Sequence, residues 1–461
     1  MNLTGSRVGI VGAGPTGALL AILLRRRGAV VTIYDARADP RSRPGESGRS
    51  INLALADRGI HALRQVGVFD AVRGAMVPMR GRMIHDRAGH TALQPYGARP
   101  QEVIYSISRN RLNQVLLEFA QRSPGIEIKF EHRLEAVDFS AGIAHFHTLR
   151  GAGAAVAMQP LLACDGAGSR MRRSLHEARL ISAQEDDLEH GYKELSIPAA
   201  GGGEYPLARE SLHVWPRGGY MLIALPNDDG SFTATLFLPN AGAISFAGLT
   251  TAAAIGRFMA VNFPDATALM PDLLRDFQSH PTGLIGTVRA TPWHYQGMVA
   301  LLGDAAHAIV PFHGQGMNCC FEDCVDFAAC VDRHASWEAS FAAFFAMRKA
   351  NTDAIAAMAL QNYAEMRERV ADPKFQLQSA LSRELQRRDP GRFIPRYSMV
   401  MFHHEIPYSI AESRGLVQER LLQDLTRDAA TLAEVDMERA QLEIEARLPP
   451  IADDLSSVTK L

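Results

Sequence analysis

The sequence lacks long apolar runs, an excess of charge of either sign, and enough cysteine for a disulfide framework. Among its 461 residues no stretch reaches the roughly 20 apolar positions that a membrane-spanning helix needs. The 48 basic and 50 acidic side chains leave a formal charge of -2, so no basic footprint for nucleic acid is present. Five cysteines in a chain of this length favour a reducing compartment, and we expect a cytoplasmic protein without a membrane anchor.

Four of the five cysteines crowd into residues 319–330, where a metal site is the alternative to simple packing. Zinc sites usually present CxxC pairs on turns, whereas FEDCVDFAAC has helical spacing with small apolar residues. Buried free cysteine behaves as a small hydrophobe. We therefore predict a helix here and no metal.

The stretch LLGDAAHAIVPFHGQGMNCC, residues 301–320, has the polar and glycine content of an active site but no nucleophile. It contains one Asp and two His, but no Ser, no Lys and no paired carboxylates. A site with these residues suits chemistry that a bound cofactor supplies, while the protein provides orientation and exclusion of water.

The N-terminus has the pattern of a βαβ unit. RVGIVG is a short apolar strand, PTGALLAILLRRRG a helix closed by glycine, and AVVTIYDA a second strand. Gly12, Gly14 and Gly17 form GxGxxG at the first turn, and Asp35 ends the second strand. Backbone N–H groups at such a turn can meet a pyrophosphate, and the carboxylate can accept ribose hydroxyls. We predict dinucleotide binding, the alternative being a glycine-packed crossing of helix and strand.

Three motifs then follow one another along the chain: GxGxxG, the turn Asp165-Gly166-Ala167-Gly168-Ser169 with Arg172, and Gly303-Asp304. Together they resemble the single-component FAD-dependent aromatic hydroxylases, the para-hydroxybenzoate-hydroxylase-like family. A finer resemblance, to kynurenine 3-monooxygenases, runs from residue 7 to about 420. It is carried by GRSINLAL, MRGRM, LQPYG, HGYKEL, PFHGQGMN, QNY and RFIPRYSM.

The pattern and the resemblance imply an α/β fold in which a Rossmann-type FAD-binding domain is interleaved with a mixed β-sheet substrate domain. The run YMLIALPNDDGSFTATLFL predicts a hairpin of the substrate sheet. We expect the FAD-binding domain over residues 1–75, 100–180 and 285–335, and the substrate domain over 76–99 and 181–284. Residues 336–461 have helical patterns, and we expect them to form a domain that covers the active site.

The resemblance also implies how FAD is held. Asp165 and Gly166 would lie near the pyrophosphate, Asp304 would hold a ribityl hydroxyl, and Arg109 would contact the flavin. Backbone donors at a helix N-terminus would face the pyrimidine edge of the flavin, where negative charge develops on reduction. Those donors belong to Gly316, Met317 and Asn318.

For the substrate, the resemblance implies a carboxylate held by Arg82, Tyr96, Asn362 and Tyr397. A planar guanidinium with hydroxyl and amide donors suits this task. The alternatives without a binding role are a surface salt bridge for Arg82, half-buried packing for Tyr96 and Tyr397, and a helix-surface position for Asn362. Alternation along the hairpin predicts an apolar slot for the ring, with Leu222 and Phe237 as candidates. Phe312 and His313 would lie near the ring, and His313 would either shape the site or transfer a proton.

The implied reaction is hydroxylation of L-kynurenine at the 3-position by a flavin C4a-hydroperoxide, with NADPH and O₂ as co-substrates. One alternative is a hydroxylase of a ring-substituted kynurenine or another amino-aromatic acid. A second is a flavin-bound redox-sensing or interaction protein that no longer hydroxylates. The choice of NADPH over NADH rests on the resemblance alone, because no second GxGxxG is present. Nothing in the sequence indicates an oligomeric state.

Overall fold

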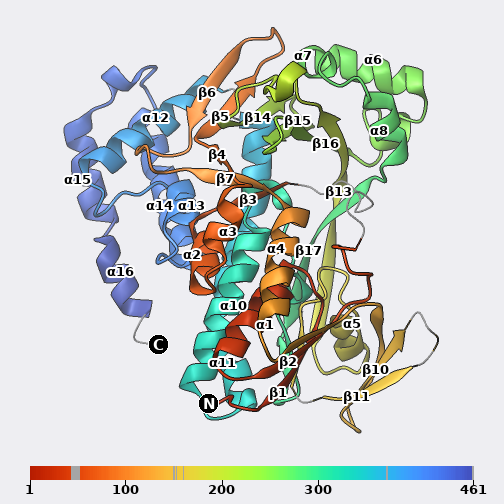
Figure 1. The fold of residues 1–461 in the computed structure, drawn as a ribbon. Coiled ribbons are helices and arrows are strands. Elements are labelled where there is room, and N and C mark those ends of the chain that lie inside the picture. Colours follow the sequence, from red (N-terminus) through yellow and green to blue (C-terminus); the bar gives the residue numbers. More distant parts are fainter. Residues whose placement is uncertain (43–51, 149–150, 152, 159, 370–371, 459–461) are drawn as a thin grey trace. The chain divides into compact units, whose positions relative to one another are not determined.

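A computed structural model describes residues 1–42, 52–148, 151, 153–158, 160–369 and 372–458 (Figure 1). The Gly-Arg-Ser-Ile of GRSINLAL, which carried part of the resemblance, lies outside the described residues. The chain divides into two compact units, each assembled from three separate segments. The first comprises Met1–Met76, Ile107–Leu188 and Ile285–Ala356, and the second Val77–Ser106, Glu189–Leu284 and Ala357–Leu461. The predicted α/β fold with a helical C-terminal region is confirmed.

The first unit contains a largely parallel sheet with the strand order β18-β19-β12-β1-β2-β8. Only β18 runs antiparallel to its neighbour. The strands are β1 (Arg7–Val11), β2 (Val30–Tyr34), β8 (Ile126–Lys129), β12 (Leu161–Ala163), β18 (His294–Tyr295) and β19 (Val299–Leu301). Because the carboxyl ends of parallel strands meet at one edge, β1, β12 and β19 bring the three sequence motifs to the same edge of the sheet.

The first unit also confirms the predicted βαβ start. Helix α1 (Pro15–Arg26) follows β1, and Gly17 through Leu24 are all buried, so the apolar run GALLAILL is a core helix. The other elements of this unit are β3 (Asn52–Leu55), α2 (Asp57–Gln65), α3 (Phe69–Arg73), α4 (Arg109–Arg122), β9 (His132–Asp138), β10 (Ile143–Thr148), β11 (Ala154–Ala157), α5 (Arg170–Glu177), α9 (Asp304–His307), η3 (Pro311–His313) and α10 (Gly316–Arg333). Four elements continue from one unit into the other: β7 (Ile104–Ser108), β13 (Ser182–Ile197), β17 (Gly283–Thr291) and α11 (Trp337–Ala364).

The second unit is built on a mixed sheet that contains the strand order β13-β16-β15-β14-β5-β6. The predicted hairpin is confirmed, since β15 and β16 pair antiparallel from Met221↔Phe237 to Pro226↔Phe232. Strand β5 runs parallel to β14, and β6 runs antiparallel to β5. The strands of this sheet include β5 (Gly81–His85), β6 (Thr91–Pro95), β14 (Ser211–Pro216), β15 (Met221–Pro226) and β16 (Phe232–Pro239). Strand β4 (Val77–Met79) pairs with β7 in a separate, smaller sheet.

One face of this sheet packs against helices and forms an apolar core. Trp215, Leu222, Leu236 and Leu238 lie in that core with Met259 and Phe263. The helical elements of this region are η1 (Gly201–Gly203), η2 (Phe246–Gly248), α6 (Ala252–Asn262), α7 (Pro264–Thr267) and α8 (Leu273–Ser279). The opposite face carries Arg82, as the strand register below shows.

The C-terminal segment of the second unit is helical and has its own apolar cluster, which includes Leu381, Phe393 and Leu421. Its elements are η4 (Glu365–Arg369), α12 (Pro373–Arg388), α13 (Arg396–Phe402), α14 (Tyr408–Thr426), η5 (Leu432–Glu434), α15 (Met437–Arg447) and α16 (Ile451–Val458). No helix in the described part of the chain is both long and apolar enough to cross a membrane.

Candidate functional site

The glycine-rich turn after β1 has the geometry of a pyrophosphate seat. Gly12 has φ +105°, and a Cβ there would lie 2.3 Å from the carbonyl oxygen of Cys164. A Cβ on Gly17 would lie 2.0 Å from the carbonyl oxygen of Gly12, whereas Gly14 faces open space. Gly14 precedes α1, which has no side-chain cap. The first N–H groups of an uncapped helix are free to bind an anion.

Asp35 lies at the end of β2, and its carboxylate is already saturated with hydrogen bonds. Oδ2 accepts from the backbone N–H of Ala13 at 2.7 Å and from Nη2 of Arg37 at 2.9 Å. Oδ1 accepts from the backbone N–H and the Nε of Arg37. Burial acts to raise the pKa of Asp35, but Arg37 and these N–H donors outweigh it and hold the pKa below its usual value. A ribose can bind Asp35 only in exchange for Arg37, whose side chain is 68% exposed.

In the turn after β12, the carboxylate of Asp165 caps the N-terminus of the following helix. Asp165 accepts hydrogen bonds from the Ser169 hydroxyl and from the backbone N–H groups of Arg170 and Met171, at the start of α5. Burial raises the pKa of Asp165 against these hydrogen bonds. A Cβ on Gly166 would meet nothing within 4 Å. The predicted pyrophosphate contact is therefore open to the backbone of this turn, while the Asp165 carboxylate is engaged in capping.

Arg172 joins this turn to the Gly303-Asp304 turn. Its side chain is fully buried. Nη1 donates to the carbonyl oxygen of Ala305 at 3.0 Å, and Nη2 donates to the carbonyl of Ala167 and to Glu185. One guanidinium thus fixes the spacing between two of the three turns at the edge of the sheet.

The Gly303-Asp304 turn leads from β19 into α9. Gly303 has φ +60° and ψ -141°, a conformation that L side chains rarely adopt, and it is glycine that permits the turn. The Asp304 carboxylate is half-buried, and the Cys320 thiol lies 3.6 Å from Oδ1 as a weak donor. Burial raises the pKa of Cys320 far above its usual value, so the thiol keeps its proton.

Helix α10 begins at Gly316 and has no side-chain cap, so its first N–H groups lack intrahelical acceptors. The Asn318 side chain is fully engaged elsewhere: Oδ1 accepts from Ala56 N, and Nδ2 donates to the carbonyls of Ala54 and Gly314. Asn318 can therefore offer a cofactor only its backbone. Arg109, at the start of α4, is exposed.

These residues fit FAD. A helix N-terminus without a cap, open turns at Gly14 and Gly166, and an accessible carboxylate at Asp304 match a pyrophosphate and a polyol chain. All the predicted FAD residues lie in the first unit, which is consistent with one continuous binding edge.

The four predicted carboxylate-binding residues converge in the second unit. Arg82 on β5 donates from Nη2 to Oδ1 of Asn362, near the end of α11, at 3.4 Å. Its guanidinium lies 4.9 Å from the ring centroid of Tyr397 on α13 and 5.8 Å from that of Tyr96. The two tyrosine rings stack with centroids 5.4 Å apart and planes at 16°. Burial raises the pKa of both tyrosines, so both are neutral hydroxyl donors near pH 7.

Arg82 is a half-buried cation without a carboxylate partner in the described part of the chain. Its Nε atom is buried, and it makes no hydrogen bond to a described residue. The nearby Glu365 is paired with Arg396 at 2.9 Å instead. A buried charge is costly unless it is paired, so this arrangement favours the binding of an external anion.

Strand register decides which hairpin residues share the face of Arg82. Arg82 pairs with Leu212 in β14, and alternation then places Val214, Ile223 and Phe237 on the same face. Leu222 pairs with Trp215 and Leu236 on the opposite face and is fully buried in the core beneath α6. The prediction that Leu222 lines the slot for the substrate ring is therefore corrected, because Leu222 lies on the face opposite Arg82. Phe237 remains a candidate for that slot.

Phe312 and His313 form the short helix η3 between α9 and α10 in the first unit, and both side chains are buried. They lie directly before the N-terminus of α10, so they remain candidates for contact with the substrate ring next to the flavin. A role of His313 in proton transfer stays a prediction.

The sequence did not reveal four residues near the three turns: Arg37, Arg172 as a bridge, Asp323, which accepts from the backbone N–H of Gly303, and Arg348, which donates to Asp323. Arg172 was noted only as the end of a motif. The signal for Asp323 and Arg348 was a carboxylate and an arginine inside apolar helical patterns, at positions that the structure shows to be almost fully buried.

Comparison with known proteins agrees with this geometry. The family model described as FAD binding domain matches residues 6–196 and 273–336. The chain is 49% identical over 443 residues to a kynurenine 3-monooxygenase of Xanthomonas axonopodis pv. citri, covering 96% of this chain and 97% of that protein. A kynurenine 3-monooxygenase of Stenotrophomonas maltophilia is 49% identical over 448 residues, covering 95% and 96%.

Among solved structures, the chain resembles the tetrameric form of 2-methyl-3-hydroxypyridine-5-carboxylic acid oxygenase. The TM-score is 0.66 at 18% identity, with 83% of this chain and 98% of that chain covered. A likeness at this identity supports the fold alone.

Proposed function

This chain belongs to the kynurenine 3-monooxygenase family, and we propose that it hydroxylates L-kynurenine at the 3-position with FAD, NADPH and O₂. We further propose that the first unit binds FAD and that the second holds the substrate. The five cysteines are all free and buried, which suits a reducing compartment, and we infer that the protein works in the cytoplasm.

The observation that carries the substrate proposal is the half-buried guanidinium of Arg82, which has no carboxylate partner among the described residues. Two neutral tyrosines and an amide surround it, and Glu365, the nearby carboxylate, is taken by another arginine. An α-amino acid carboxylate would supply the missing charge and accept hydrogen bonds in the plane of the guanidinium. Phe237, on the same sheet face, offers apolar surface for the aromatic end of such a ligand.

When bound, FAD supplies the redox chemistry, and the side chains bind, orient and exclude water. Asp304 would hold the ribityl chain, and the α1 N-terminus would hold the pyrophosphate. In the second unit, Arg82, Tyr96, Asn362 and Tyr397 would fix one end of the substrate, so that the ring has a defined direction. The helical C-terminal segment contributes two of these four residues, and we propose that it covers the substrate.

The test is to incubate the FAD-loaded protein with NADPH, O₂ and L-kynurenine and to detect hydroxykynurenine by mass. Arg82→Met should weaken kynurenine binding by about 100-fold, the loss expected for a charge-assisted hydrogen-bonded pair. Val261→Ala, which truncates an exposed side chain of the same unit, serves as the matched control.

Three results would contradict the proposal in different ways. NADPH oxidation without a hydroxylated product would make kynurenine an effector only. Faster turnover of a ring-substituted kynurenine would show that this compound, rather than L-kynurenine, is the preferred substrate. Flavin that NADPH cannot reduce, with or without kynurenine, would favour a redox-sensing protein over an enzyme.

A further inference from the structure

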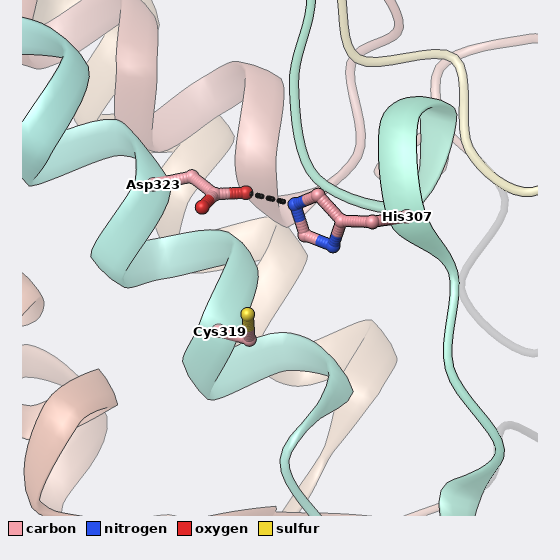
Figure 2. Close-up of side chains that lie close together, drawn as sticks. All are labelled: His307, Cys319 and Asp323. Atoms are coloured by element: carbon pink, nitrogen blue, oxygen red, sulfur yellow. Dashed lines mark hydrogen bonds and ion pairs between the residues drawn. The ribbon is translucent and has the colours of Figure 1, made fainter. Parts of the chain in front are cut away.

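Three buried side chains close to the Gly303-Asp304 turn form a cluster that could ligate a metal (Figure 2). Cys319 and Asp323 come from α10, and His307 from the facing helix α9. His307 Nε2 lies 2.5 Å from Oδ2 of Asp323. One potential ligand atom from each residue lies within 4.8 Å of the other two.

The cation of this cluster is Arg348. Its Nε donates to Oδ1 of Asp323 at 2.8 Å, and its Nη2 lies 3.4 Å from the Cys319 sulfur. Nη1 completes the set with Glu322 at 2.6 Å and Asp326 at 3.1 Å. The guanidinium of Arg348 already neutralises Asp323, the carboxylate that a metal would need. The cluster is therefore an ion-pair network centred on arginine rather than a metal site.

Asp323 also reaches the turn that carries Asp304. Its Oδ2 accepts from the backbone N–H of Gly303 at 3.1 Å, in addition to the bond from His307. His307 ends α9, the helix that Asp304 begins. One carboxylate thus fixes both ends of a single helical turn, while Cys320, three residues earlier on α10, lies against the Asp304 carboxylate.

We propose that Asp323 is a positioning residue for FAD, which holds the Gly303-Asp304 turn through Gly303 and His307 so that Asp304 faces the ribityl chain. The inference rests on the proposed role of Asp304 in FAD binding. It adds a residue that would not touch the cofactor.

The ionised form of Asp323 is what this task requires. Every group that contacts its oxygens is a donor: a backbone N–H, an imidazole N–H and a guanidinium N–H. Burial acts to raise the pKa of Asp323, but His307 and Arg348 outweigh it and lower the pKa. An asparagine in this place would turn an NH₂ group toward at least one donor, and the turn would shift away from it.

The experiment is a double-mutant cycle read by FAD affinity. Full-length apoprotein is titrated with FAD, and the quenching of flavin fluorescence gives Kd for wild type, Asp323→Asn, Asp304→Asn and the double variant. Asp323→Asn should weaken FAD by about 30-fold in the wild-type background, which corresponds to the loss of one charge-assisted hydrogen bond. In the Asp304→Asn background the same change should cost less than about 3-fold, because the carboxylate that it positions is already gone.

Asp326→Asn is the matched control, because Asp326 contacts Arg348 from the next turn of α10 without reaching Gly303 or His307. It should leave the FAD Kd within about 3-fold of wild type. If Asp323→Asn does not fold, His307→Phe replaces it in the double-mutant cycle. A phenyl ring keeps the packing against Trp293 but removes the imidazole N–H that donates to Asp323.

Each outcome assigns the failure to one assumption. Equal losses for Asp323→Asn in both backgrounds would overturn the positioning role and leave Asp304 as a direct contact. An Asp304→Asn variant with the FAD affinity of wild type would overturn both roles. Kynurenine hydroxylation is a separate readout, so neither result decides the proposed substrate.

Discussion

At the scale of single residues, the most informative feature is the missing counter-charge of Arg82. Asn362 Oδ1, at 3.4 Å from Nη2, occupies the position that a carboxylate oxygen would take. Asn362→Asp should therefore create an internal ion pair, raise thermal stability and weaken kynurenine binding by at least about 100-fold, because the new carboxylate competes with that of the substrate. Titration of kynurenine and thermal melting check the two effects together.

The control for this prediction is Asn362→Ala, which removes one amide without adding charge. It should weaken kynurenine by only about 5- to 10-fold, the loss of one hydrogen bond, and should not raise the melting temperature. Equal losses for the Asp and Ala variants would show that Arg82 does not select an anion.

The residues of this cluster could be predicted only by resemblance. Arg82 and Asn362 are 280 positions apart, and no periodicity or spacing links them. For Asp35, the pattern indicates a ribose-binding acid, but it does not show that three donors of Arg37, two positions later, bind the same carboxylate. Local patterns show which residue types are present, whereas side-chain pairing depends on the three-dimensional neighbours.

At the scale of elements, the buried side chain of Arg172 fixes two short turns to each other. Arg172→Lys keeps the charge, but a single ammonium cannot reach Ala167, Ala305 and Glu185 together. We expect a loss of about 2 kcal/mol in unfolding free energy, as for buried acceptors left without donors. FAD binding should weaken as well, because the spacing between the two turns relaxes. Denaturant unfolding and FAD titration measure these losses.

Arg170→Lys is a suitable comparison, because Arg170 is the neighbouring arginine on α5 and is partly exposed. It should change both quantities little, since partly exposed arginine contacts contribute modestly. A result in which the two variants behave alike would contradict a bridging role for Arg172.

Elements with strong periodicity were predictable from sequence, and the faces of strands were not. The βαβ start, helix α10 and the β15–β16 hairpin follow from apolar spacing and turn residues. Leu222 was misplaced because alternation divides a strand into two faces without saying which one carries Arg82. Only the register of β14 against β5 decides that question.

At the scale of the whole chain, each unit is assembled from three separate segments, so its boundaries depend on contacts between residues far apart in sequence. Two groups in different units also respond to pH in opposite directions. Burial lowers the pKa of His213, in the second unit, to about 4, so its contribution to stability is lost as pH falls below 6.5. Asp326, in the first unit, shows the reverse behaviour.

Burial raises the pKa of Asp326 from 3.8 to about 6, and the carboxylates of Glu322 and Asp323 add to this effect, while Arg348 acts against it. Between those two values the folded chain holds a proton that the unfolded chain has lost, so stability falls as pH rises through this window. Asp326→Asn should therefore raise the unfolding free energy by about 1 kcal/mol at pH 7.5 and by almost nothing at pH 3.5, the gain being moderated by the 29% exposure of the side chain. Comparing wild type and variant at each pH cancels the contribution of His213. A gain that is equal at both pH values would show that the pKa of Asp326 is the same in the folded and the unfolded chain, which would contradict the raised pKa.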